Sequence, residues 1–195
     1  MSKSKIAALI LAAGTASRWR AAGGLSASKL VADFAGKPLV RHVAEAAAHS
    51  RAWPVIAVTG HAAAAVMACV QGLALTCVHN ADYASGLASS LKTGIAALPP
   101  DAAGVVVLLG DMPRVSAGLI DRLIDAFEAH PGAAIIPVHQ GQRGNPVVLP
   151  RSIFGQIAGL TGDVGARQIL NRSGVETVEV VASDEVLLDV DTPPT

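Results

Sequence analysis

A turn of small residues near the N-terminus is followed by two positively charged side chains, a combination suited to holding phosphate. The apolar run that begins at Ile6 leads into this turn. Its small side chains let a ligand approach the backbone, whose N–H groups can bind phosphate oxygens. Farther on, Arg18 offers a planar fork of donors that grips phosphate, and Lys29 offers a movable positive charge. The sequence predicts a phosphate site here, formed with the turn residues Ala12, Ala13, Gly14 and Thr15. The alternative is that the small residues only pack a helix against the end of the strand.

A single carboxylate follows the most apolar strand candidate, in the run VVVLLGDMPRV. Burying the charge of Asp111 at this edge costs free energy unless the carboxylate is solvated, paired or bound to a cation. Mg²⁺ is usually held by one or two carboxylates together with substrate phosphates. Asp111 is therefore a candidate magnesium ligand facing the phosphate site. In the alternative interpretation Asp111 is a turn or cap residue, aided by Pro113.

Three polar segments toward the C-terminus are candidates for binding a second substrate or for completing the metal site. Asn145 lies in a predicted tight turn, RGNP. Gly162, Asp163 and Gly165 open a predicted helix, where backbone amides can hold an anion. The alternative is that Asp163 simply caps that helix. Asp189 and Asp191 bracket one position of a predicted late strand, and at most one of the pair is expected to reach a metal.

Composition limits the class of protein. The chain has 195 residues, 51% hydrophobic and 15% charged, with a formal net charge of zero. This excludes intrinsic disorder, which needs low hydrophobicity and high net charge. No basic stripe indicates nucleic acid, and no stretch approaches the ~20 apolar residues of a membrane span. We expect one domain over residues 1–195, in the cytoplasm.

Several well-known site motifs are missing from the sequence. It contains no G-x-x-x-x-G-K-[ST], and no G-x-G-x-x-G follows the first strand candidate. This argues against an ordinary P-loop NTPase and against an oxidoreductase with a dinucleotide fingerprint. H-E-x-x-H and G-x-S-x-G are also absent, so none of the six histidines is assigned a catalytic role.

Strand and helix candidates alternate along the chain, which predicts an α/β fold with a mostly parallel sheet. The strands are expected at Ile6–Leu11, Val55–Thr59, Leu75–His79, Val105–Leu109, Ala134–Val138, Pro146–Leu149 and Val175–Val181. The helices are expected at Leu39–His49, His61–Val70, Leu87–Leu98, Ala117–His130, Ile153–Leu160 and Gly165–Asn171. Ligands of such sheets bind beyond the carboxyl ends of the strands. The small-residue turn and Asp111 both follow strand ends and are expected to meet there.

The ordered motifs resemble a known family. LILAAGTASR, a lysine before GKPLVRHV, NADYASGLASSLKTGIAAL, LLGDMPRV, GNPV, GDVGARQIL and DVDTP are together similar to the molybdenum cofactor cytidylyltransferases. The resemblance implies a Rossmann-like three-layer nucleotidyltransferase fold. It also implies Mg²⁺-dependent transfer of CMP from CTP to the phosphate of molybdopterin, with release of pyrophosphate. Transient docking to a molybdoenzyme resembling xanthine dehydrogenase is a further implication.

The resemblance also assigns roles to residues. Arg18, Lys29 and Asp111 would be catalytic, the two cations acting on the triphosphate, and Asp111 would be the principal Mg²⁺ ligand with Asp191, or less favourably Asp189, as the second. Gly86 falls in the stretch that faces nucleotide in the family. The nucleotide would be bound by Leu11, Ala12, Ala13, Gly14, Thr15, Ser89 and Ser90. The acceptor would be bound by Asn145, Gly162, Asp163 and Gly165. Ala13 resembles the cytidylyl branch and favours CTP over GTP.

Two alternative functions remain open at this point. One is the same fold acting on GTP or on another phosphorylated acceptor. The other is a non-catalytic carrier of the cofactor, suggested by the eleven positions between Arg18 and Lys29, a longer spacing than in the family. Asp111 argues for catalysis, because a carrier has no need of Mg²⁺ on a nucleotide. An acceptor phosphate is already a nucleophile near pH 7, so no general base is expected.

Overall fold

A central sheet forms the middle of the molecule in the computed structural model, which describes residues 6–15, 19, 28–163 and 165–190. Its strand order is β10-β7-β9-β6-β1-β4-β5, with β8 pairing to β7. The strands are β1 (Ile6–Ala12), β4 (Val55–Thr59), β5 (Thr76–His79), β6 (Gly104–Leu109), β7 (Ala134–His139), β8 (Gln142–Arg143), β9 (Val147–Pro150) and β10 (Thr177–Val181). A separate hairpin joins β2 (Asp33–Phe34) to β3 (Lys37–Pro38).

Most neighbouring strands run parallel, and β9 is the main exception. β1 pairs in parallel with both β4 and β6, and β10 pairs in parallel with β7. β9 is antiparallel to β6 and to β7. The chain reverses direction after β7 through β8, so the following strand returns beside β7 in the opposite direction. The predicted α/β class with a mostly parallel sheet is confirmed.

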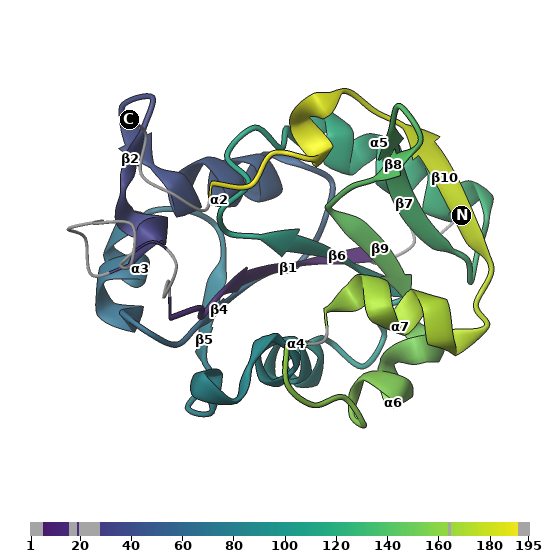
Figure 1. Cartoon of the computed structure of the whole chain (residues 1–195), viewed down its shortest axis with the longest axis horizontal. Helices are drawn as coiled ribbons and strands as arrows, with labels where there is room; N and C mark the ends of the chain where they lie inside the picture. The colour runs from purple at the N-terminus through teal and green to yellow at the C-terminus, as the bar shows by residue number, and fades with distance from the viewer. Residues whose placement is uncertain (1–5, 16–18, 20–27, 164, 191–195) are drawn as a thin grey trace.

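Helices cover both faces of the sheet, giving three layers (Figure 1). One face carries α2 (Leu39–His49), α3 (Ala63–Cys69) and α5 (Ala117–Ala129); the other carries α4 (Leu87–Ala96), α6 (Phe154–Ile157) and α7 (Ala166–Ser173). Alternate residues of β1 enter opposite cores: Ala8 and Ile10 pack on the α2 side, and Leu9 and Leu11 on the α4 side. A strand buried on both faces has no polar alternation, which explains the continuous apolar sequence of β1.

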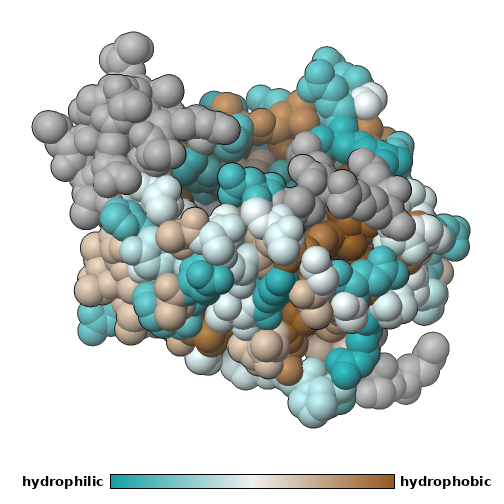
Figure 2. Space-filling view, turned by 60° about the horizontal axis from the view of Figure 1, so that its bottom comes forward, coloured by the Kyte–Doolittle hydropathy of each residue, from teal (hydrophilic) through white to brown (hydrophobic). Residues whose placement is uncertain are grey.

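The outer surface of the α4, α6 and α7 layer is turned toward the viewer in Figure 2, where hydrophobic and hydrophilic patches alternate. No helix within the described ranges has both the length and the apolar character needed to span a bilayer.

Three predicted helices are shorter than expected by two residues or more. The helix predicted at His61–Val70 runs over Ala63–Cys69 (α3), and the other two are shortened for local reasons. The helix predicted at Ile153–Leu160 is reduced to a 3-10 turn, η3 (Arg151–Ile153), and the single turn of α6. Glycines at 155 and 159 weaken helix formation there. α4 ends at Ala96, because Pro99 and Pro100 follow closely and disfavour helical backbone before them.

The late strand predicted around Asp189 is not formed. Residues 188–190, the last that the structure describes, are irregular and follow the 3-10 turn η4 (Asp184–Val186). The expectation that a strand orients Asp189 and Asp191 is therefore wrong, and Asp191 lies outside the described residues.

Candidate functional site

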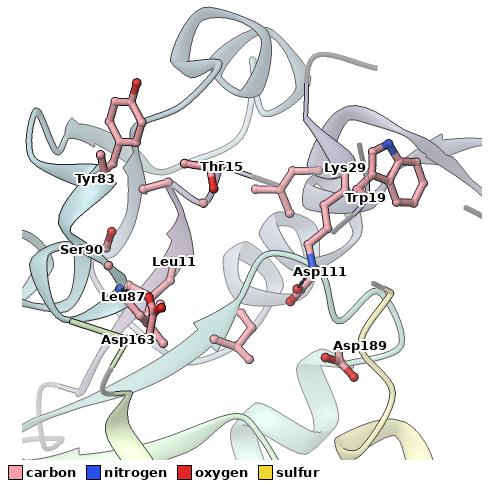
Figure 3. Close-up of a pocket in the computed structure, with 16 residues that line it drawn as sticks. Leu11, Thr15, Trp19, Lys29, Tyr83, Leu87, Ser90, Asp111, Asp163 and Asp189 are labelled. Carbon is pink, nitrogen blue, oxygen red and sulfur yellow. Dashed lines mark hydrogen bonds and ion pairs between the residues drawn. The ribbon is translucent and has the colours of Figure 1, made fainter. Parts of the chain in front are cut away.

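A cleft of about 480 Å³ opens at the carboxyl ends of β1 and β6. Both strands are parallel neighbours, so the segments that follow them meet at the same edge of the sheet. Further walls come from η1 (Lys29–Val31) and from η2 (Tyr83–Ser85) with the start of α4. The cleft is lined by Leu11, Ala13, Gly14, Thr15, Trp19, Lys29, Leu30, Tyr83, Ala84, Gly86, Leu87, Ser90, Leu109, Asp111, Asp163 and Asp189 (Figure 3).

The end of β1 forms the floor of this cleft. Its backbone is fixed on both sides, because Gly110 N–H donates to Leu11 O and His61 N–H donates to Ala13 O, each at 3.1 Å. Leu11 and Ala13 line the cleft, while the intervening Ala12 is fully buried in the opposite core. Gly14 is exposed where the chain leaves the strand. The turn therefore offers backbone and little side chain to a ligand, as the small residues predict.

Lys29 and Asp111 form an ion pair on one wall, with Nζ 2.6 Å from Oδ2. Lys29 is placed by η1, whose start is capped by the Ser28 hydroxyl accepting from Leu30 N–H. Asp111 directly follows β6 and Gly110. Both side chains are largely buried, so the two charges compensate each other in a site of restricted solvent access.

A second carboxylate reaches the same cleft. The N–H of Val190 donates to the backbone oxygen of Asp111 at 3.0 Å, and this contact places the preceding Asp189 at the cleft wall. The residues described contain no cluster of three or more metal-ligating side chains. Two carboxylates fit a Mg²⁺ ion, which takes few protein oxygens and completes its shell with phosphates and water. They do not make a preformed all-protein metal cage.

The opposite wall is formed by the start of α4 against the segment around residue 162. Gly86 has a φ of +109°, and a Cβ there would lie 2.5 Å from the carbonyl carbon of Gly162. Ala88 N–H donates to Gly162 O at 3.1 Å, and Leu87 N–H donates to Asp163 Oδ1 at 3.3 Å. Asp163 therefore satisfies an amide of α4. The alternative that it caps its own helix is wrong, because α7 begins after Gly165 with no side-chain cap.

A second hollow of about 500 Å³ adjoins the first and shares Leu109 and Asp189 with it. Its other lining residues are Met112, Gln142, Arg143, Asn145 and Leu187. Asn145 is held by its backbone N–H, which donates to Val186 O at 2.9 Å. Because the two hollows meet at Leu109 and Asp189, a ligand in one would lie beside a ligand in the other.

The structure brings most of the predicted site residues into these hollows. Arg18 and Asp191 lie outside the described residues, so their predicted roles stay predictions. Of the predicted residues that the structure describes, four line neither hollow: Ala12, Ser89, Gly162 and Gly165. The remaining predicted residues line the cleft or the second hollow. Sequence reasoning missed Trp19, Leu30, Tyr83 and Leu87 as lining residues.

Two of the missed residues carried some signal in the sequence. Tyr83 is the single tyrosine of the chain and stands inside the NADYASG run. Trp19 is 4% exposed although it lies between two arginines, and its Nε1 has no hydrogen-bond partner among the described residues.

Comparison with known proteins gives a consistent picture. The family model described as "MobA-like NTP transferase domain" matches residues 8–179. The chain is 29% identical over 119 residues to the molybdenum cofactor cytidylyltransferase of Escherichia coli, covering 61% of this chain and 59% of that protein. It is 34% identical over 139 residues to the bifunctional protein GlmU of Leifsonia xyli, covering 70% of this chain and 28% of that one. The chain thus spans less than two thirds of the length of these relatives.

Solved structures show the same fold. Rv0371c from Mycobacterium tuberculosis superposes with a TM-score of 0.79 at 27% identity, covering 96% of this chain and 94% of that one. Its complex with manganese superposes at 0.74 with 23% identity, covering 93% of this chain and 90% of that one. A nucleotidyl transferase from Methanothermobacter superposes at 0.81 with 23% identity, covering 96% and 92%.

Proposed function

We propose that the chain, which belongs to the family of MobA-like NTP transferase domains, is a nucleotidyltransferase that transfers CMP from CTP to the phosphate of molybdopterin with release of pyrophosphate. The observation that carries this proposal is the cleft itself. The turn at Gly14 and the carboxylate of Asp111 follow two parallel strands, β1 and β6, and line the cleft together with Lys29 of η1. The resemblance to the Escherichia coli enzyme supports the choice of substrates.

The proposed chemistry follows from charge. The triphosphate would lie against the Gly14 turn with Lys29 and Arg18 on its oxygens, and the acceptor would enter the second hollow beside Asn145. A phosphate oxygen of the acceptor forms a bond to the α-phosphorus. The bond from the α-phosphorus to the bridging oxygen breaks, and pyrophosphate leaves with the electron pair. Positioning and charge stabilisation supply most of the rate in such transfers.

Asp111 and Asp189 are proposed to hold Mg²⁺, with Asp191 as a further candidate. When bound, this ion would neutralise charge on the triphosphate and on the departing pyrophosphate. The carboxylates and Lys29 stand on the same wall, so the metal and the phosphates would be held side by side.

The nucleotide is tested by thermal unfolding with Mg²⁺ and CTP, GTP, ATP or UTP in turn. A ligand at about 100 times its Kd adds ~2.7 kcal/mol, which shifts Tm by several degrees in a chain of this size. A shift with CTP alone, lost without Mg²⁺, supports the proposal. A shift with GTP keeps nucleotidyl transfer and reverses the preference suggested by Ala13.

The acceptor is tested by pyrophosphate release with molybdopterin and CTP. Binding of molybdopterin with no pyrophosphate released would favour the carrier function. Release with another phosphorylated acceptor would replace the acceptor and keep the reaction.

We further propose that residues 1–195 act as one nucleotidyltransferase domain in the cytoplasm and dock transiently on a molybdoenzyme resembling xanthine dehydrogenase. The match of the family model over residues 8–179 supports the single domain. Docking is tested by cofactor transfer: preloaded protein should activate such an enzyme faster than free cofactor at the same concentration.

A further inference from the structure

The side chain of Asn80 is held in one orientation at the end of β5. It is 3% exposed, and its backbone N–H donates to Thr59 O at 2.7 Å. Its Oδ1 accepts a hydrogen bond from Asp82 N–H at 3.0 Å. An amide NH₂ group cannot accept from a backbone N–H, so the oxygen must face Asp82 and Nδ2 must face the other way. The direction of every hydrogen bond that this side chain makes is therefore fixed.

Nδ2 of Asn80 donates to two neighbouring serines, Ser89 Oγ at 2.8 Å and Ser90 Oγ at 3.1 Å. The two hydroxyls then differ in whether their proton is already donated to a neighbouring group. The single proton of Ser89 is taken by Gly86 O at 2.8 Å or Asp82 O at 2.9 Å. The Ser90 hydroxyl accepts from Asn80 and donates to none of the residues that the structure describes. Ser90 is 4% exposed and lines the cleft. Its proton is therefore available to a ligand there.

Ser90 stands on the wall opposite Lys29 and Asp111 (Figure 3). Figure 3 shows Ser90, Leu87, Tyr83 and Asp163 on one side, with Lys29 and Asp111 on the other. If the phosphates of a nucleotide lie by Lys29, its nucleoside part extends toward Ser90. Asp163 adds a carboxylate on that side, which disfavours phosphate and favours neutral groups of the ligand.

We propose that Asn80 is a positioning residue that fixes the Ser90 hydroxyl as a hydrogen-bond donor to an acceptor atom of the bound nucleoside, such as the carbonyl oxygen of a pyrimidine base. The inference rests on the proposed nucleotidyl transfer and adds to it how one wall of the cleft selects its ligand. A ligand that presents a donor here could use only the second lone pair of Ser90 Oγ and would leave the buried hydroxyl proton without a partner, so such a ligand is disfavoured.

An isosteric substitution tests this inference. Asn80→Asp keeps Oδ1 for Asp82 N–H and replaces the NH₂ group by an oxygen acceptor. The Ser90 proton would then turn inward toward that oxygen, reversing the direction of the bond. Binding of CTP and of inorganic tripolyphosphate, each with Mg²⁺, is measured by titration calorimetry. We expect CTP to bind about 5- to 10-fold more weakly to Asn80→Asp and tripolyphosphate to bind as it does to the unmodified chain.

Further variants separate positioning from folding and from long-range charge. Ser90→Ala should show the same selective loss, and Asn80→Asp should add nothing further in the Ser90→Ala background. Asn80→Ala removes the amide without burying a charge and should also weaken CTP selectively. Ser85→Ala is the matched control, because its hydroxyl binds Asp82 away from the cleft.

The outcomes distinguish failure of the role of Asn80 from failure of the proposed nucleotidyl transfer. An equal loss for CTP and tripolyphosphate, or no loss for either, overturns the role of Asn80 and leaves nucleotidyl transfer standing. If the unmodified chain binds no nucleotide at all, the proposed function fails, and the role of Asn80 fails with it.

Discussion

Lys29 and Asp111 compensate each other's charge on one wall of the cleft, with Nζ 2.6 Å from Oδ2 and about one sixth of each side chain exposed (16% and 17%). A cation that binds Asp111 competes with this ammonium group for the carboxylate, and a triphosphate offers the ammonium group a new partner. Binding of metal and binding of nucleotide are therefore expected to favour each other. Neither ligand alone can release the pair at no cost.

Replacing the lysine tests this coupling. Lys29→Met should bind Mn²⁺ alone about two- to fivefold more tightly, because Asp111 loses its competing cation. The same variant should bind CTP about tenfold more weakly, because a charged hydrogen bond to phosphate is lost. Free Mn²⁺ is followed by electron paramagnetic resonance. Lys37→Met is the control, since Lys37 pairs with Glu45 outside the cleft. Weaker Mn²⁺ binding by Lys29→Met would contradict the competition.

Removing the charge of Asp111 tests its role with little change in shape. Asp111→Asn should abolish Mn²⁺ binding and lower the rate of pyrophosphate release by at least about 100-fold, since charge stabilisation dominates such reactions. Tm should fall by several degrees while the chain stays folded, because the largely buried charge of Lys29 loses its carboxylate partner. Asp184→Asn removes an exposed aspartate paired with Arg114 and should leave Mn²⁺ binding and the rate of pyrophosphate release unchanged. Normal turnover by Asp111→Asn would remove it from the proposed mechanism.

Gly86 is a structural requirement where the start of α4 packs against the segment around residue 162. Gly86→Ala would place a Cβ 2.5 Å from the backbone of Gly162 at a φ of +109°. We expect a loss of about 2 kcal/mol or more, which lowers Tm by about 4–8 °C in thermal unfolding. Gly155→Ala is the matched control, because a Cβ there meets nothing within 4 Å and α6 favours alanine. An equal Tm for the two variants would show that the two segments separate easily.

Glu45 gives the chain an acid-sensitive contribution to stability far from the cleft. Hydrogen bonds from Lys37, and less strongly from Arg41, lower the pKa of Glu45 below its ordinary 4.5, with burial acting against them. A carboxyl whose folded pKa is depressed stabilises the folded state above the unfolded pKa, and this contribution is lost as pH falls through the folded pKa. The Tm difference between the unmodified chain and Glu45→Gln should shrink as pH falls from about 6 to about 3, from an initial effect of about 0.5 kcal/mol. A difference that stays constant over this range would contradict the assignment.

The fold was predictable because its signals are local. The apolar run of β1 and the 3.6-residue periodicity of α5 depend on neighbouring residues alone, and both elements form close to their predicted bounds. The direction of β9 was not predictable in this way, because an antiparallel strand and a parallel strand have the same apolar sequence. Only the reversal through β8 decides it.

The charged side of the site was also visible in the sequence, since Gly14 and Asp111 each follow a buried strand and such strand ends meet at one edge of a parallel sheet. The opposite wall, where the start of α4 packs against the segment around residue 162, is determined only by tertiary structure. Leu87 and Asp163 are 76 positions apart, and nothing local indicates that the carboxylate of one reaches the amide of the other. Likewise, the sequence shows Asn80 and Ser90 only as members of one polar run. Which of their protons faces the cleft depends on how β5 and α4 pack together, because hydrogen-bond direction follows from three-dimensional contacts and not from residue type.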